Sequence, residues 1–130
     1  MALQLSDVVR NARLDAIETA VGVSAVLKIY DLTAGAPANC AAAITGTVLA
    51  TLSLPSDWMT AAASGSKAKT GTWQDASADA AGTADFFRLF ASDGTTCHLQ
   101  GTVTATGGGG DLTLDNGLIA AGQSDTITGF

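Results

Sequence analysis

The stretch Thr83-Ala-Asp-Phe-Phe-Arg-Leu-Phe-Ala-Ser-Asp-Gly-Thr-Thr-Cys-His-Leu-Gln-Gly-Thr-Val103 decides the fold that this sequence predicts. It holds three of the four phenylalanines and places Asp93-Gly94 between two segments that favour β structure. Side chains alternate along a strand, so Phe86, Arg88 and Phe90 should share one face. Asp-Gly between alternating segments is a strong hairpin signal. We therefore expect a hairpin here, with the other elements arranged around it.

Short β segments separated by turn residues continue on both sides of this hairpin. The intervening segments 33–46 and 75–82 are rich in small and turn-forming residues and are expected to be loops. About seven to nine short strands with such links are typical of sandwiches and barrels. The sequence predicts a mainly β fold, an antiparallel β-sandwich or jelly-roll-like domain preceded by one N-terminal α-helix. Beyond the hairpin, the predicted strands span residues 25–30, 47–54, 67–75, 111–115, 118–121 and 125–130.

One helix is predicted at the N-terminus, over residues 7–21. Ser6 can cap its first turn, and Gly22 follows its last residue, as glycine commonly does at a helix end. Leu14 and Ile17 lie along one side of it. This divides the chain into an N-terminal helix or docking arm, residues 1–22, and a β-sandwich domain, residues 23–130. The helix either packs over one end of the sheet or reaches out to a partner.

Composition and charge exclude several classes of function. The 130 residues carry a formal net charge of −6 and scattered cations, which argues against nucleic-acid binding. No apolar run reaches the roughly 18 residues of a membrane span, and the first residues do not form a secretory signal. We therefore expect no membrane partner and assembly in a cytoplasm. Much of the apolar content is alanine, so part of the stability should come from neighbouring molecules.

The two cysteines, Cys40 and Cys97, lack the spacing of metal ligands. In a reducing cytoplasm, two buried thiols are the expected state. A disulfide is the alternative, and it requires the two Cα atoms to lie within about 7 Å of each other.

No arrangement of catalytic or metal-binding residues is evident. His98 is the only histidine, and on a strand its imidazole points away from the Cys97 thiol, so a Cys-His pair is not expected. The glycines at 107–110 lack the Lys and Ser/Thr of a phosphate loop; they suit a flexible hairpin tip or a close passage of two backbones. The aspartates lack calcium-loop spacing. We expect no enzymatic activity, no cofactor and no metal.

The remaining cations suggest an interaction surface. In the predicted strand 67–75, Lys67 and Lys69 share one face, where they either protect an edge strand from unwanted pairing or form salt bridges across an interface. With the helix residues, these lysines complete the set of candidate interface residues: Arg10, Arg13, Leu14, Ile17, Lys67 and Lys69.

Four segments resemble a family of small virion structural proteins of tailed bacteriophages: Ser6–Gly22, Leu49–Met59, Thr95–Val103 and Asp111–Asn116. Within that group the chain is similar to capsid decoration (cement) proteins. The resemblance implies a homotrimer on the virion capsid surface that binds the major capsid protein or other virion proteins and stabilises the shell. It transfers no functional residue.

Two alternative functions remain open. A tail or head–tail junction component would share this composition and fold. A carbohydrate-binding β-sandwich module would need exposed aromatic rings, for which Tyr30, Trp58 and Trp73 are the candidates. Trp58, beside a turn, either covers the core or is an exposed binding anchor.

Overall fold

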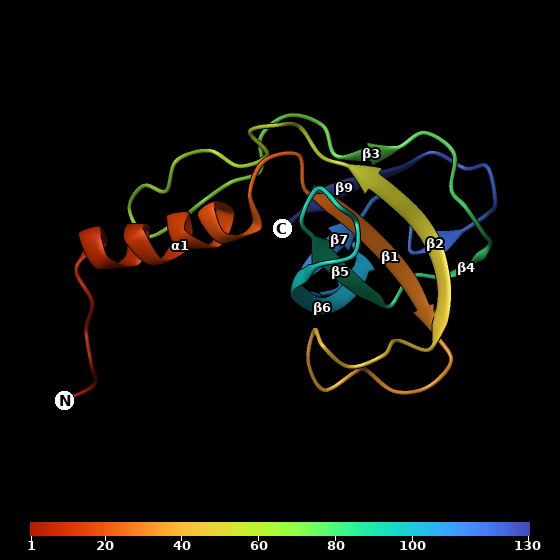
Figure 1. Cartoon of the computed structure of the whole chain (residues 1–130), viewed down its shortest axis with the longest axis horizontal. Coiled ribbons are helices and arrows are strands. Elements are labelled where there is room, and N and C mark those ends of the chain that lie inside the picture. Colours follow the sequence, from red (N-terminus) through yellow and green to blue (C-terminus); the bar gives the residue numbers. More distant parts are fainter.

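Seven strands form one nearly closed sheet in the computed structural model, which describes residues 1–130 (Figure 1). The predicted mainly β, barrel-like sandwich with one N-terminal helix is confirmed. All neighbouring strands are antiparallel except β6 and β7. Two further strands, β4 (Gly82–Thr83) and β8 (Leu118–Ile119), pair with each other. In sheet order the seven are β2 (Gly46–Ser53), β1 (Val26–Leu32), β5 (Phe86–Phe90), β6 (Cys97–Ala105), β7 (Leu112–Leu114), β9 (Asp125–Gly129) and β3 (Gln74–Asp75).

Side-chain and loop contacts bridge the seam between the outer strands β2 and β3. The Thr51 backbone N–H donates to Asp75 Oδ2 at 2.9 Å, and the Asp79 N–H donates to the Leu49 carbonyl at 2.7 Å. These bonds satisfy polar groups on the edge of β2 that would otherwise be free to pair with another chain. We refer to the sheet with its loops as the barrel.

The hairpin expected between Phe86 and Val103 is present as the antiparallel pair β5–β6. Its turn is longer than the two residues Asp93-Gly94. The Asp93 carboxylate accepts hydrogen bonds from the backbone N–H groups of Thr95 and Thr96, both at 2.8 Å, and from the Thr96 hydroxyl. Bonds from Thr96 and Thr95 stabilise the ionised carboxylate and lower the pKa of Asp93 to about 2.

Large side chains fill the barrel interior in spite of the alanine-rich composition. Trp58 is 0% and Trp73 1% exposed, and their rings lie with centroids 5.9 Å apart. Both indole N–H groups donate to backbone carbonyls, Trp58 to Gly22 and Trp73 to Thr70. Trp58 is therefore a core residue and not an exposed binding anchor. Val21, at the end of the helix, is also buried in this core.

The prediction of a strand over residues 67–75 is wrong for most of that range. Only Gln74–Asp75 forms a strand, and the preceding residues fold back as a narrow β-hairpin with isolated bridges Met59–Lys69 and Ala63–Ser66. Its tip is Ser64-Gly65, where φ is +51° and +74°. Two consecutive positive φ angles are the geometry of a tight hairpin turn. We call residues 59–69 the short hairpin.

The glycines at 107–110 allow a tight return between two parallel strands. After Ala105 the chain turns back beside β6 and then runs forward as β7, with Val103 opposite Leu112. A Cβ on Gly108 would lie 2.6 Å from the Thr104 Cβ, so no side chain fits there. The close-passage interpretation is correct, whereas the hairpin-tip interpretation is wrong because the flanking strands are parallel.

Candidate functional site

Helix α1 (Asp7–Val21) projects from one end of the barrel (Figure 1). Its predicted bounds are confirmed: Ser6 Oγ accepts from the Val9 N–H at 3.4 Å, and the Gly22 N–H closes the last turn on the Glu18 carbonyl. The helix has no extensive contact with any strand. Its support is the short hairpin, which runs beside it in Figure 1. We call α1 and the short hairpin together the arm.

The short hairpin binds the polar side of α1. The side chains of Asn11, Asp15 and Glu18, at helical spacing along one face, accept backbone N–H groups from this hairpin. The donors, in the same order, are Gly65 at 2.8 Å, Ala62 at 2.9 Å and Met59 at 3.2 Å. Each bond satisfies an amide that an isolated hairpin would leave to water.

Lys67 reinforces the same contact. Its Nζ lies 2.7 Å from Asp15 Oδ1 and 2.8 Å from Glu18 Oε2, and its side chain is only 4% exposed. Burial opposes the charged ammonium, but the two carboxylates outweigh it and raise the pKa of Lys67. The hydrogen bond from Lys67 in turn lowers the pKa of Asp15. Lys67 therefore forms its salt bridges within this chain.

Lys69 does not contact the other candidate interface residues through its ammonium group. Its Nζ donates to the Gly71 carbonyl at 3.0 Å. Because residues 67–73 do not form a strand, neither Lys67 nor Lys69 lies on a sheet edge that it could protect.

The other four candidate residues line one hollow. Arg10, Arg13, Leu14 and Ile17 surround a space of about 400 Å³ beside Gly65. A second hollow of about 160 Å³ continues from Leu14 and Ile17 and is lined, among others, by two barrel residues, Leu99 and Phe130. We call these six side chains of α1 and the barrel the arm groove: Arg10, Arg13, Leu14, Ile17, Leu99 and Phe130.

Leu99 and Phe130 were missed in the sequence because they join the groove only through the fold. Leu99 lies on β6, and Phe130 follows β9. The Phe130 ring packs against Trp73 and Phe87, with centroids 5.3 and 5.9 Å apart. Alternation along strand 97–103 marks Leu99 as one of the inward set, but nothing local places it beside Ile17.

The remaining side of α1 is also apolar. Its N-terminal half faces solvent, whereas Ala16 and Ala20 line a hollow of about 260 Å³ with His98 and Leu99 of β6. Val8 is 78% and Val9 43% exposed. Ala12, Ala16 and Ala20 lie on the Val9 side of the helix and are exposed as well. We call the four residues Val9, Ala12, Ala16 and Ala20 the alanine strip. The helix therefore binds its own domain through its polar side and leaves apolar side chains uncovered.

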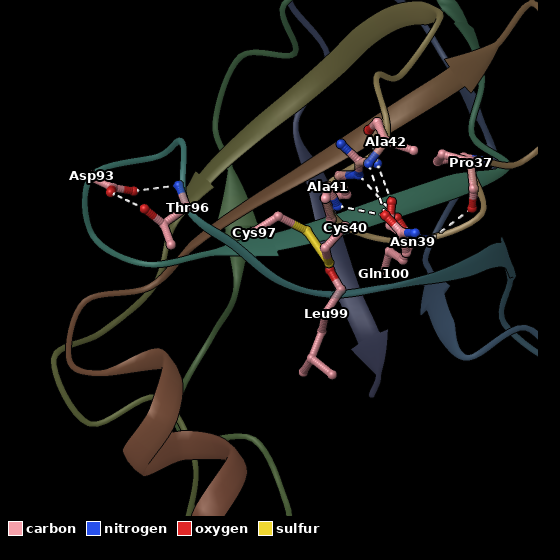
Figure 2. The surroundings of a disulfide bond; sticks show 11 residues. Pro37, Asn39, Cys40, Ala41, Ala42, Asp93, Thr96, Cys97, Leu99 and Gln100 are labelled. Carbon is pink, nitrogen blue, oxygen red and sulfur yellow. Dashed lines mark hydrogen bonds between the residues drawn. A yellow bond between two sulfur atoms is a disulfide. The ribbon is translucent and has the colours of Figure 1, made fainter.

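A disulfide joins Cys40 to Cys97, with the Cα atoms 5.4 Å apart, so the prediction of two free thiols is wrong (Figure 2). The bond holds loop 33–45 over the outer face of β5. Arg88, 6% exposed, lies beneath this loop and donates through Nη2 to the carbonyls of Asn39 at 3.1 Å and Ala42 at 2.8 Å. No local sequence pattern indicates that loop 33–45 crosses the outer face of β5.

One carboxylate is buried in the barrel. Asp125 accepts from Gln123 Nε2 at 2.7 Å through Oδ1, while its Oδ2 has no partner. Burial disfavours the charge and raises the pKa of Asp125. No group of three or more His, Cys, Asp or Glu side chains is arranged to hold a metal ion. No helix has the length and apolar character needed to cross a membrane.

No protein-family model, curated protein or solved structure matches this chain. The arm, with its arm groove and alanine strip, is therefore assigned as the candidate site from its own geometry and chemistry.

Proposed function

We propose that this chain is a structural protein of a tailed-phage virion that decorates and stabilises the capsid shell by binding the major capsid protein, without catalysis. The observation that carries the proposal is the orientation of α1. Asn11, Asp15 and Glu18 turn inward to the short hairpin, and the apolar side chains are left uncovered.

This orientation is the reverse of that in a self-contained domain. A surface helix ordinarily buries its apolar stripe and presents its polar face to water. Uncovered apolar surface on a projecting element is typical of a contact site for another molecule. The alanine strip suits a shell contact because small side chains allow a close approach over a flat surface. We assign this strip to the major capsid protein.

The resemblance to phage decoration proteins supports the same function. It implies homotrimers on the virion surface, where one patch per subunit is reused by symmetry and many weak contacts act together. The chain would be assembled in the host cytoplasm. Since disulfides form in oxidising surroundings, we propose that the Cys40–Cys97 bond closes after the particle leaves the host.

The direct test is the copy number of this chain in purified particles, measured by quantitative mass spectrometry against the major capsid protein. A ratio near that of a coat component supports decoration. A small fixed number per particle would instead favour a tail or head–tail junction component, and complete absence from particles would refute a virion role.

A second experiment tests the assigned contact. Purified heads lacking this chain are incubated with the wild-type protein or with Val9→Asp, and the bound protein is counted after sedimentation. Val9→Asp places a charge in the alanine strip and should abolish binding, whereas Val23→Asp, at an exposed valine outside α1, should not. Equal binding of both variants would contradict the assignment.

The carbohydrate-binding alternative lacks the exposed rings that it requires. Trp58 and Trp73 are core residues, and Tyr30 is buried as well. No aromatic platform for a sugar ring is formed by these three residues.

A further inference from the structure

Charge is distributed unevenly between the arm and the rest of the chain. The arm carries four cations, Arg10, Arg13, Lys67 and Lys69, against three carboxylates, Asp7, Asp15 and Glu18. Outside the arm there are nine carboxylates and only two cations, Lys28 and Arg88. Both of these cations are held internally, Lys28 on the Gly94 carbonyl and Arg88 beneath loop 33–45. The surface outside the arm is therefore strongly acidic.

Two cations of the arm, Arg13 and Lys69, have no carboxylate partner, and Arg13 lies in the arm groove. Lys67 is neutralised by Asp15 and Glu18, and Arg10 pairs with Asp7. Arg13 forms no salt bridge and lies exposed at the mouth of the hollow beside Leu14 and Ile17. The groove thus offers an apolar floor with a cation at its outer end.

A surface of opposite character lies on β8, remote from α1. Leu118 is 68% exposed, and Val23, at 69%, is the only other large apolar side chain of the barrel that is exposed. It pairs with Thr83 of β4, whose N–H donates to the Asp31 carboxylate at 3.0 Å. Asp85 lies two residues beyond Thr83, and Asp115 three residues before Leu118. In Figure 1, β4 and α1 are at opposite ends of the molecule.

We propose that the arm groove of one copy binds this Leu118 corner of a second copy. The leucine would enter between Leu14 and Ile17, and the carboxylates around it would face Arg13 and Arg10. Burying an exposed leucine in this groove removes apolar surface from water on both sides. Complementary charge at the edge fixes the orientation and excludes like-charged alternatives.

Because the two surfaces are different and lie at opposite ends, the contact is head-to-tail. Such contacts close into rings when the rotation between copies allows it and otherwise extend into filaments. The inference rests on the proposed role as a multi-copy structural protein and names its partner in self-association. It leaves Val9 and Ala12, the N-terminal half of the alanine strip, free for the shell.

The test uses the isolated full-length protein and analytical ultracentrifugation. Arg13→Glu puts a carboxylate opposite the acidic corner, and Leu118→Lys puts an ammonium opposite Arg13. Each should weaken self-association by about tenfold or more. The lysine stem can still lie in the groove, so the combined variant Arg13→Glu with Leu118→Lys should recover a substantial part of the loss.

Val23→Lys is the matched control, since Val23 is 69% exposed and lies outside both surfaces; it should leave association unchanged. Circular dichroism melting verifies that each exposed substitution leaves the fold intact. A wild-type protein that stays monomeric at high concentration would overturn the inference. So would single variants that associate normally, or a combined variant no better than the singles. These outcomes are independent of whether the chain is found in particles, so the two proposals fail separately.

Discussion

The barrel and the arm are held together by opposite kinds of side chain. In the barrel, Trp58, Trp73 and their aliphatic neighbours are enclosed, and the charged side chains face water except for Arg88 and Asp125. In the arm, Asn11, Asp15, Glu18 and Lys67 make the contacts that hold α1 to the short hairpin, while valine and isoleucine side chains of the helix remain exposed. The barrel encloses an apolar core, which a stable domain needs, and the arm has no core of its own.

This difference shows where in the molecule apolar side chains remain unburied, as the composition suggests. An alanine-rich chain with 5% aromatic residues is expected to depend on its neighbours for stability. In the structure, that dependence falls mainly on the arm, because most large residues of the barrel are enclosed and only Val23 and Leu118 are exposed there. Losses of core packing should therefore unfold the protein, whereas losses in the arm should change what it binds.

Truncation of the largest core side chain should have the greatest effect. Trp73→Ala removes a fully buried indole that packs on Trp58 and Phe130 and should cost about 3–5 kcal/mol of unfolding free energy. Ile17→Ala, in the arm, should cost less than about 1 kcal/mol. Urea denaturation followed by tryptophan fluorescence measures both. Similar losses for the two variants would remove the distinction between the regions.

Loss of the disulfide should have the next largest effect and should act on the barrel. Replacing both Cys40 and Cys97 by Ser frees residues 57 apart in sequence, which should cost about 3–4 kcal/mol through the unfolded chain. Chemical denaturation of the oxidised protein, the reduced protein and the double variant measures it. The reduced wild type should match the double variant, and a reduced protein as stable as the oxidised one would contradict the bond's role.

A smaller and local effect is expected when the arm's buried ammonium is removed. Lys67→Met keeps the stem but leaves Asp15 and Glu18 without their cation. Amide hydrogen exchange in α1 should speed up by about tenfold, with a change in global unfolding free energy below about 1 kcal/mol. Lys69→Met is the matched control, because Lys69 bonds only Gly71 and should leave α1 exchange unchanged. Equal effects in α1 and the barrel would show that the two regions unfold together.

The smallest effect is a pH dependence to which Asp15, in the arm, and Asp125, in the barrel, contribute with opposite sign. The pKa of Asp15 is lowered from 3.8 by Lys67, so its stabilising contribution is present above that value and is lost as the pH falls below it. The pKa of Asp125 is raised by burial, so its contribution is complete at low pH and is lost as the pH rises through the raised pKa.

Acid should therefore weaken the contact of Asp15 with Lys67 in the arm and remove the cost of burying a charged Asp125. The Asp93 carboxylate of the barrel keeps its charge down to about pH 2. Hydrogen exchange at neutral pH and near pH 3 should show α1 losing protection before the barrel does. Asp125→Asn should raise the melting temperature at neutral pH and have little effect in acid. Loss of barrel protection before that of α1 would contradict the assignment.

Local patterns were sufficient to predict the helix and the central hairpin. The Ser6 cap, the Gly22 stop and the helix between them are as expected, because these signals act within one turn of the chain. The hairpin Phe86–Val103 formed for the same reason, since alternation and Asp93-Gly94 act over neighbouring residues. Four of the candidate interface residues lie together because one helix carries them.

The features missed depend on contacts between distant segments. Alternation at 67–75 resembles a strand, but Lys67 points to Asp15 and Glu18 of α1, 52 and 49 positions earlier, rather than to a neighbouring strand. Nothing near Cys40 shows that its loop reaches Cys97. The parallel return at Gly108 likewise appears only when β6 and β7 are placed side by side.

The absence of a side chain at Gly65 has a consequence for the arginine that borders the groove. A methyl group there would lie 3.0 Å from Arg10 Nε, on a backbone with φ +74° that favours glycine. Any other amino acid at position 65 would push the guanidinium aside by several tenths of an ångström. A glycine without a side chain thereby determines the position of the Arg10 guanidinium beside the arm groove. Alanine at this position would change what the groove binds without changing the sequence of α1.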